Sequence, residues 1–381
     1  MDFSAQLRFG YRRMEALVAP RAGGAPRFAA IYRIRSDAGA IEARAQAIAV
    51  EQSVEMPLTA IAEPEILRDI VGQVEHIEHR GSDVFDVRIA LASATIGNDA
   101  GQLLNMLFGN TSLHDDVVLL DADIPPDLAA AFGGPRHGID GLRRRVGAFS
   151  RALTCSALKP QGVPPVRLAQ LAEQFARGGI DFIKDDHGLA NQAYSSFAER
   201  VAAVAGAIGR TYVPSLSGDL DAMRGQIDTA CRHGVDTVLI APMIAGWATM
   251  QALVRQYPDV AFIAHPSMGG AARIVPDLLI GKLFRLLGAD AVIFPNHGGR
   301  FGYSPETCLR LAENARASWR GLRPSVPVAA GGMTLERVSE MLDFYGPDAM
   351  LLIGGSLLAA RERLTEESAA FARAVAQHSY R

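Results

Sequence analysis

The chain has 381 residues, of which 49% are hydrophobic and 21% are charged, and its formal net charge is −3. These values are typical of a globular protein with room for two domains, or for one large domain with an extension. They give no electrostatic reason to expect nucleic acid or an anionic membrane surface as a partner.

Three cysteines, Cys155, Cys231 and Cys308, are widely spaced and form no CxxC pair. Their odd number and spacing argue against a disulfide framework or a structural zinc site. The opening segment MDFSAQLRFGYRR lacks the basic and then apolar pattern of a signal peptide. Apolar runs are interrupted by Gly, Pro or charge before they reach membrane-spanning length. We therefore expect a cytoplasmic protein.

The first part of the chain predicts a small α+β domain. Its expected elements, in chain order, are a strand over 27–35, a helix over 40–54, a hairpin over 71–91, a helix over 97–109 and a strand over 116–125. Gly81-Ser82-Asp83 is the hairpin signal. This order is that of a ferredoxin-like domain, which we assign to residues 1–140. A Pro- and Gly-rich connection over 124–141 follows it.

The remainder alternates short apolar runs with helix-like stretches. Eight strands are expected, over 151–159, 179–186, 211–218, 237–243, 260–267, 291–297, 327–332 and 349–355. Several intervening helices, such as 219–234 and 334–346, open with Asp or Thr and close on Gly. Eight regular units favour a (β/α)8 TIM barrel over an open doubly wound sheet, and we assign it to residues 141–381.

Polar residues fall at the carboxyl ends of the predicted barrel strands, where barrel active sites lie. In chain order they are Lys159, then Lys184, Asp185, Asp186 and His187, then His265, and finally Asn296, His297 and Arg300. Because the carboxyl ends of all eight strands share one rim, we expect these side chains to lie near one another.

The stretch GGIDFIKDDHGLANQ, residues 178–192, carries the densest cluster. Alternation with period two puts Phe182, Lys184 and Asp186 on one face. A desolvated lysine loses its proton easily, which suits a Schiff base, a general base or a carbamate. Asp186 offers a hard oxygen ligand for Mg²⁺. The structural alternative is a buried Lys–Asp ion pair at the barrel rim.

Double glycines end the last two strands, Gly331-Gly332 and Gly354-Gly355. Such pairs let the backbone approach an anion without an intervening Cβ, and many barrels bind phosphate at this place. The alternative is tight turning between strand and helix.

Two further features have a functional and a structural interpretation. The loop over 296–303 combines flexible glycines with Arg300, which suits a lid that closes over a substrate, or else a mobile solvent loop. His265 stands at a strand end as a substrate contact, or else as a core histidine.

Read in order, these motifs resemble the large subunit of ribulose-bisphosphate carboxylase (RuBisCO), and more specifically the RuBisCO-like proteins, over most of the chain. Residues 178–192 resemble the family's metal motif, and SALKP at 156–160 resembles its first-strand motif. The other resembling segments are VEQSVEMP, ATIGND, GPRHGI, FIAHPSMGG, HGGRFGY, VAAGGM and LIGGSL.

The resemblance implies chemical roles in the barrel. Lys184 would be converted by CO2 to a carbamate and would bind Mg²⁺ together with Asp186, with His187 at the third ligand position. Lys159 would be the acid/base lysine, and His265 would contact the substrate.

The resemblance also implies a phosphate site and a partner. Gly331, Gly332, Gly354 and Gly355 would hold a phosphate of the substrate. Glu51 and Asn98 would reach the active site of a neighbouring subunit, which implies a homodimer with shared active sites.

Several positions depart from the carboxylase pattern. His187 replaces a metal carboxylate, which moves the preference from Mg²⁺ toward softer metals. The other replacements are Gln161 for a second lysine, Pro266 for a phosphate-binding arginine, Arg300 for the lid lysine, and Ile293-Phe294 for a polar pair. We therefore do not expect a ribulose-bisphosphate carboxylase.

What remains is enolate chemistry on a singly phosphorylated keto-sugar or keto-sugar-acid. We favour decarboxylation or carbon–carbon cleavage, for example of 3-oxo-isoapionate 4-phosphate. The alternatives are a methionine-salvage enzyme, either 5-methylthioribulose-1-phosphate isomerase or diketo-methylthiopentyl-phosphate enolase, and a non-catalytic sensor of a phosphorylated metabolite.

Overall fold

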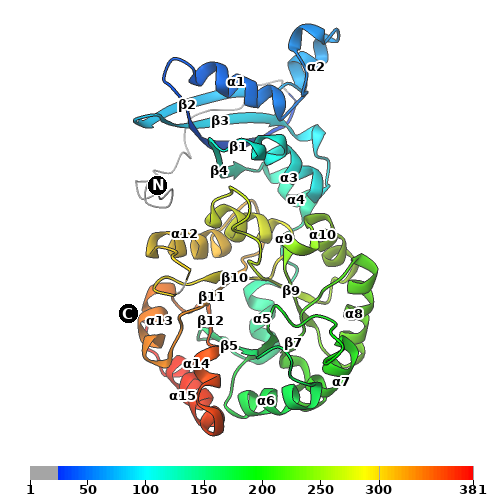
Figure 1. The fold of residues 1–381 in the computed structure, drawn as a ribbon, viewed down its shortest axis with the longest axis vertical. Coiled ribbons are helices and arrows are strands. Elements are labelled where there is room, and N and C mark those ends of the chain that lie inside the picture. Colours follow the sequence, from blue (N-terminus) through cyan, green and yellow to red (C-terminus); the bar gives the residue numbers. More distant parts are fainter. Residues whose placement is uncertain (1–24, 300, 381) are drawn as a thin grey trace.

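A computed structural model describes residues 25–299 and 301–380. It contains a four-stranded sheet and an eight-stranded sheet, and the smaller sheet lies above the larger one in Figure 1.

The four-stranded sheet has the predicted order of elements. They are β1 (Arg27–Arg35), α1 (Ile41–Glu51), β2 (Gln73–Gly81), β3 (Val84–Ala92), α3 (Ala100–Phe108) and β4 (Val117–Asp123), with the short helix α2 (Pro64–Asp69) between α1 and β2. The strand order is β2-β3-β1-β4, and the described pairings are antiparallel. Alternate residues of β1, such as Tyr32 and Ile34, are buried in the main core because the pleat turns one face inward.

The predicted connection over 124–141 is helical in part. It contains α4 (Pro126–Phe132) and the first turn of α5 (Gly138–Val146). The sequence did not predict these helices because the Gly and Pro residues beside them are typical of a linker. The carboxylate of Asp290 accepts 2.7 Å hydrogen bonds from the backbone N–H groups of His137 and Gly138, which fixes α5 at the amino-terminal end of the barrel strands. The predicted boundary between residues 140 and 141 falls inside α5, and the division into two domains stays a prediction.

The eight-stranded sheet closes on itself. Its strands are β5 (Leu153–Leu158), β6 (Phe182–Asp185), β7 (Tyr212–Val213), β8 (Thr237–Ile240), β9 (Ala261–Ala264), β10 (Ala291–Pro295), β11 (Val326–Ala330) and β12 (Met350–Leu352). Neighbours in the chain are neighbours in the sheet, and β12 pairs with β5. A bridge between Ser215 and Leu239 joins β7 to β8. The TIM barrel is confirmed.

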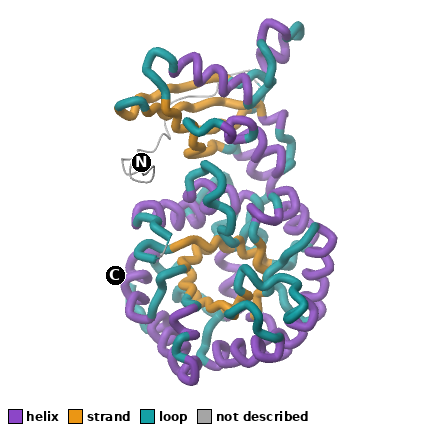
Figure 2. The backbone as a smooth tube through the Cα atoms, viewed as in Figure 1, coloured by secondary structure: helices purple, strands orange, loops and turns teal. Residues whose placement is uncertain are grey.

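Helices surround the strands as an outer ring (Figure 2). They are α6 (Pro165–Arg177), α7 (Phe197–Ile208), α8 (Leu220–Arg232), α10 (Trp247–Gln256), α12 (Pro305–Arg316), α13 (Val338–Tyr345) and α15 (Leu364–Ala376). The shorter helices are α9 (Pro242–Ala245), the π-helix η6 (Asp277–Leu283), α11 (Phe284–Leu286) and α14 (Gly355–Leu358). Inward side chains such as Leu153, Phe182 and Val328 fill the barrel with a separate apolar core.

Backbone hydrogen bonds and an ion pair join the small sheet to the barrel. Leu119 of β4 donates to the carbonyl of Arg273 at 2.9 Å and accepts from the N–H of Val275 at 3.0 Å, so the segment after β9 covers the edge of the sheet. Lys282 forms a 2.7 Å ion pair with Asp121 of β4. The loop that begins at His265 is therefore anchored to the small sheet.

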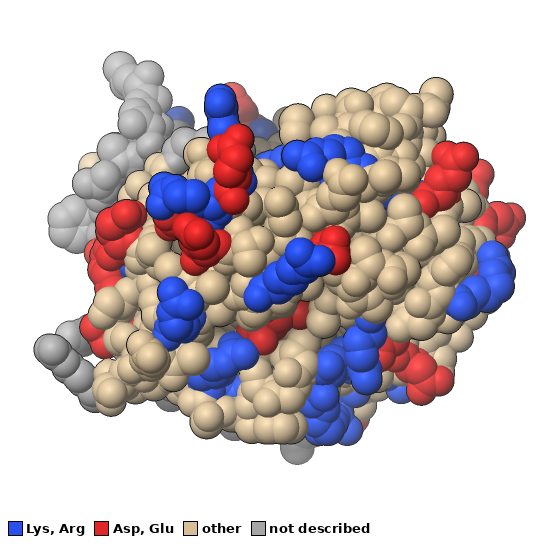
Figure 3. Space-filling model, turned by 90° about the horizontal axis from the view of Figure 1, so that it is seen from below, with Lys and Arg blue, Asp and Glu red and all other residues tan. Residues whose placement is uncertain are grey.

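The surface carries charges of both signs. On the face shown in Figure 3, acidic and basic side chains are interspersed among uncharged ones. Among the residues that the structure describes, no helix has the length and apolar character needed to span a membrane.

Candidate active site

Strand β6 sends its polar side chains to opposite sides, as the alternation predicts. Phe182 packs in the barrel interior, and Lys184 follows it on the same face with a side chain that is only 3% exposed. The Lys184 ammonium donates to the carbonyl of Asp185 at 2.9 Å. Burial lowers the pKa of Lys184, so its neutral amine form is reached at a lower pH than for a surface lysine.

Asp185 points the other way and has a structural role that the sequence did not reveal. Its carboxylate accepts hydrogen bonds from Arg200 Nε at 3.0 Å, from the Tyr212 hydroxyl at 2.8 Å and from the Ser215 N–H at 3.0 Å. Asp185 and Arg200 are both fully buried. These contacts fix β6 against β7 and α7, and thereby fix the direction of Lys184.

Side chains from three strand ends meet around Asp186. Lys159 Nζ lies 3.1 Å from Asp186 Oδ1, and His187 Nδ1 lies 3.4 Å from the same oxygen. The rings of His187 and His265 stack with centroids 4.5 Å apart and planes 8° apart. Burial opposes ionisation of Asp186, but the His187 hydrogen bond and the charges of Lys184 and Lys159 outweigh it and hold its pKa well below the usual range.

His265 is neutral in this environment. Burial, followed by the positive charge of Lys184, lowers the pKa of His265 to about 2. Its Nδ1 lies 2.8 Å from the Ser267 hydroxyl. A neutral imidazole suits a hydrogen bond to a substrate oxygen rather than a fixed positive charge.

The glycine pairs occupy the same rim. A Cβ on Gly354 would lie 4.0 Å from Lys159 Cε, so the end of β12 is adjacent to that lysine. Gly331 and Gly332 have φ of +80° and +66°, and a Cβ on Gly332 would lie 2.5 Å from Gly299 Cα. Their backbone therefore lies directly against the loop after β10.

Two predicted positions are less informative. Gly355 begins the one-turn helix α14, and its Cβ position would have no described atom within 4 Å apart from its chain neighbours and the backbone of its own helix. The predicted lid residue Arg300 lies outside the described residues.

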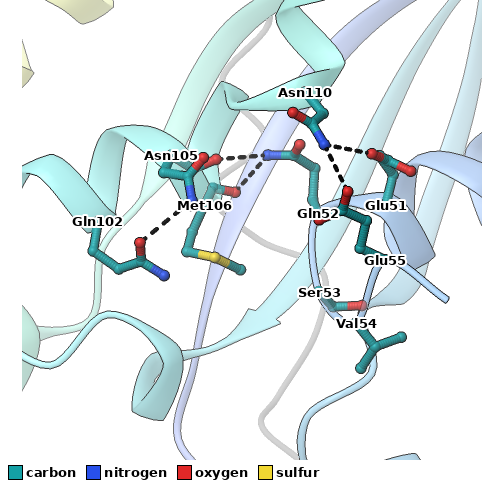
Figure 4. Close-up of a pocket in the computed structure, with 9 residues that line it drawn as sticks. All are labelled: Glu51, Gln52, Ser53, Val54, Glu55, Gln102, Asn105, Met106 and Asn110. Atoms are coloured by element: carbon teal, nitrogen blue, oxygen red, sulfur yellow. Dashed lines mark hydrogen bonds between the residues drawn. The ribbon is translucent and has the colours of Figure 1, made fainter.

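Glu51 and Asn98 lie elsewhere in this chain. Glu51 ends α1 and lines a polar cavity of about 240 Å³ whose described lining residues all fall between positions 51 and 110 (Figure 4). Asn110 Nδ2 donates to Glu51 at 2.8 Å and to Glu55 at 3.1 Å. The Asn98 carbonyl accepts from Gln251 and Arg255 of α10. None of these contacts joins Glu51 or Asn98 to the Lys184 cluster within one chain.

Comparison with known proteins assigns the family. Residues 138–298 match the catalytic domain of the ribulose bisphosphate carboxylase large chain. The chain is 62% identical over 360 residues to a Rhodospirillum rubrum protein named 5-methylthioribulose-1-phosphate isomerase, a match that covers 92% of this chain and 96% of that protein. It is 54% identical over 356 residues to ribulose bisphosphate carboxylase-like protein 1 of Rhodopseudomonas palustris, covering 91% and 97% of the two chains. The chain belongs to the RuBisCO-like proteins.

A solved structure agrees with this assignment. The crystal structure of a RuBisCO-like protein from Rhodopseudomonas palustris superposes with a TM-score of 0.87 at 49% identity, over 93% of this chain and 99% of that one. The resemblance inferred from the motifs is confirmed, and so is the two-part fold. This RuBisCO-like protein belongs to a family that includes enzymes, one of them named as an isomerase.

The RuBisCO-like resemblance implies a divalent cation. The side chains at the site can bind such an ion only under one condition. Asp186 and His187 offer an oxygen and a nitrogen ligand, but among the described residues no three His, Cys, Asp or Glu side chains are grouped to hold a metal. The ammonium groups of Lys159 and Lys184 repel a cation. A carbamate on Lys184 would reverse that charge and add an oxygen ligand. The site therefore fits a metal once Lys184 is carbamylated.

Proposed function

We propose that this protein isomerises 5-methylthioribulose 1-phosphate by enolate chemistry at the carboxyl-terminal mouth of its barrel. The observation that carries the proposal is the kinship to the Rhodospirillum rubrum isomerase across nearly the whole of both chains. It supports the isomerase, which the sequence offered as an alternative, better than the carbon–carbon cleavage that we favoured.

The groups at the barrel mouth support such a reaction. A keto-sugar phosphate is isomerised when a proton leaves a carbon beside the carbonyl and returns to a different carbon. In our proposal Lys159 moves that proton, and its 3.1 Å contact with Asp186 holds its amine over the site. His265 binds a substrate oxygen, and the backbone at Gly331, Gly332, Gly354 and Gly355 holds the single phosphate.

A bound metal would polarise the carbonyl and stabilise the negative charge that develops on oxygen. In our proposal carbamylated Lys184, Asp186 and His187 hold this ion, and Mg²⁺ is the cation that the family resemblance implies. The family resemblance makes Arg300 a further candidate catalytic residue. Glu51 and Asn98 complete the site of a second subunit, so the functional unit is a homodimer.

The test uses purified protein in D2O with bicarbonate and either Mg²⁺ or Mn²⁺. We expect 5-methylthioribulose 1-phosphate to give an isomeric phosphate that carries deuterium, measured by ¹H and ³¹P NMR. A Lys159→Met variant should lose about 10²–10⁴-fold in rate, as expected for removal of a general acid/base.

The alternatives give different results in the same experiment. Release of CO2 from 3-oxo-isoapionate 4-phosphate, without isomerisation of the methylthio substrate, would establish the cleaving enzyme instead. Conversion of a diketo-methylthiopentyl phosphate to its enol would establish the enolase. Tight binding of these phosphates without exchange or turnover would favour the sensor.

A further inference from the structure

The side chain of His265 is held on one edge by the loop that follows it. The backbone N–H of Ser267 points at His265 Nδ1 across 3.2 Å, and the Ser267 hydroxyl lies 2.8 Å from the same nitrogen. The ring is held on its face by the stacked ring of His187. Both the position of the imidazole and the partners of Nδ1 are therefore defined.

A backbone N–H is a donor and never an acceptor, so His265 Nδ1 must accept the hydrogen bond from Ser267. An imidazole nitrogen that accepts carries no proton, and in a neutral ring the proton then resides on the other nitrogen. The Ser267 hydroxyl, facing the same unprotonated nitrogen, also donates. The contacts thus select the tautomer in which Nε2 carries the proton.

The turn after β9 provides this geometry. Gly269 donates to the carbonyl of Pro266 at 2.9 Å, which closes a tight turn over residues 266–269. Met268 occupies the third position of this turn with φ of +64°, a conformation that side-chain-bearing residues rarely adopt. Backbone strain of this kind persists where the surrounding structure requires it. Ser267 occupies the second position of this turn, and both of its polar groups face the His265 ring.

We propose that His265 serves the reaction as a neutral hydrogen-bond donor through Nε2–H, and that Ser267 is the positioning residue that holds it in this tautomer. The role in turnover rests on the isomerase function proposed above, whereas the tautomer does not. A donor of this kind stabilises an oxygen that gains negative charge, as the carbonyl oxygen of a keto-sugar phosphate does on enolisation. It cannot remove a proton from the substrate.

The first measurement is a ¹H–¹⁵N correlation spectrum of protein labelled with ¹⁵N in its nine histidines, without substrate. A His265→Gln variant identifies the signals. We expect a protonated Nε2 and an unprotonated, hydrogen-bonded Nδ1. A protonated Nδ1, whether in the other tautomer or in a doubly protonated ring, would overturn the proposal. This spectrum decides the tautomer even if the isomerase function is wrong.

The second measurement compares variants in turnover of 5-methylthioribulose 1-phosphate. In Ser267→Ala the Nδ1 resonance should shift and kcat should fall about three- to tenfold, the effect of one hydrogen bond, with little change in KM. Ser267→Thr retains the hydroxyl and should restore both. Ser325→Ala is the matched control, since its buried hydroxyl donates to the Ala289 carbonyl away from the site. Ser267→Ala keeps the backbone N–H, so an unchanged resonance and kcat would show that the Ser267 hydroxyl has no positioning role.

Discussion

The distribution of lysine sets the barrel mouth apart at the scale of single residues. The chain has three lysines, Lys159, Lys184 and Lys282, and two of them lie beside Asp186. Apart from Lys282, the basic side chains elsewhere are arginines, whose guanidinium stays protonated and forms no carbamate under these conditions. Lysine at these two positions therefore provides an amine that can lose its proton.

Carbamylation of Lys184 can be observed directly. In ¹³C-bicarbonate we expect a single carbamate signal by ¹³C NMR, growing as pH rises because the neutral amine is the form that reacts with CO2. Since burial lowers the pKa of Lys184, the rise should begin at a lower pH than for an ordinary lysine. Lys184→Arg should abolish the signal and lower kcat roughly 10²–10⁴-fold.

Lys282→Arg is the control for that experiment, because Lys282 is ion-paired with Asp121 at the junction with the small sheet. It should keep both the carbamate signal and the activity. A carbamate signal that survives in Lys184→Arg would place the modification elsewhere.

The metal preference should depend on His187. An imidazole binds softer divalent ions better than Mg²⁺, while a carboxylate favours Mg²⁺. We expect His187→Glu to strengthen Mg²⁺ binding relative to Mn²⁺ by roughly tenfold, measured by displacement of Mn²⁺ in an EPR titration. His76→Glu introduces the same charge on an exposed position of β2 and should leave the ratio unchanged. Equal ratios in both variants would exclude His187 as a ligand.

At the scale of elements, the two faces of β6 have different roles. Its inner face presents Lys184, and its outer face fixes Asp185 to Arg200, Tyr212 and Ser215. Alternation alone predicted which residues share a face. The partners of Asp185 could not be predicted, since Arg200 and Tyr212 are brought to it only when β6, α7 and β7 pack together.

The contact between Asp185 and Arg200 should contribute to stability. Arg200→Met leaves a buried carboxylate without its charged partner, so we expect the free energy of unfolding to fall by about 3–5 kcal/mol. Urea denaturation measures it. Arg310→Met, which removes a partly exposed ion pair with Asp277, should cost about 1 kcal/mol or less. Similar losses in the two variants would show that burial of the Asp185 pair has no special effect.

At the scale of the whole molecule, the predicted site residues lie in two separate places. Glu51 lines a cavity between the end of α1 and α3, and Asn98 is held against α10. The Lys184 cluster lies inside the barrel rim. A second subunit would unite the two sets, and this is a prediction about assembly rather than about one chain.

Subunit mixing tests shared sites. Glu51→Gln and Lys184→Arg should each have little activity alone. When they are co-expressed, half of the dimers are mixed and one of the two sites in each mixed dimer is intact, which gives about a quarter of the wild-type activity. Sedimentation analysis should show a dimer. No recovery on mixing, with mixed dimers demonstrated, would place each active site within one chain.

The sequence by itself determined the order of the strands and the set of reactive residues at their ends. Both follow from local rules, since a period of two marks strands, helical spacing marks helices, and parallel strands of a barrel end on one rim. Motif resemblance then identified the RuBisCO-like family. The sequence pattern did not predict helices α4 and α5, because Gly and Pro at their ends are typical of a linker.

The tertiary structure alone decided how those residues are held. Asp185 became a structural anchor, His187 was stacked on His265, and the tautomer of His265 was fixed by Ser267. Ser267 is only two residues from its partner, yet its contact depends on the turn over residues 266–269, which the sequence does not specify. These features depend on side chains meeting in three dimensions, because hydrogen bonds and stacking act only over contact distances.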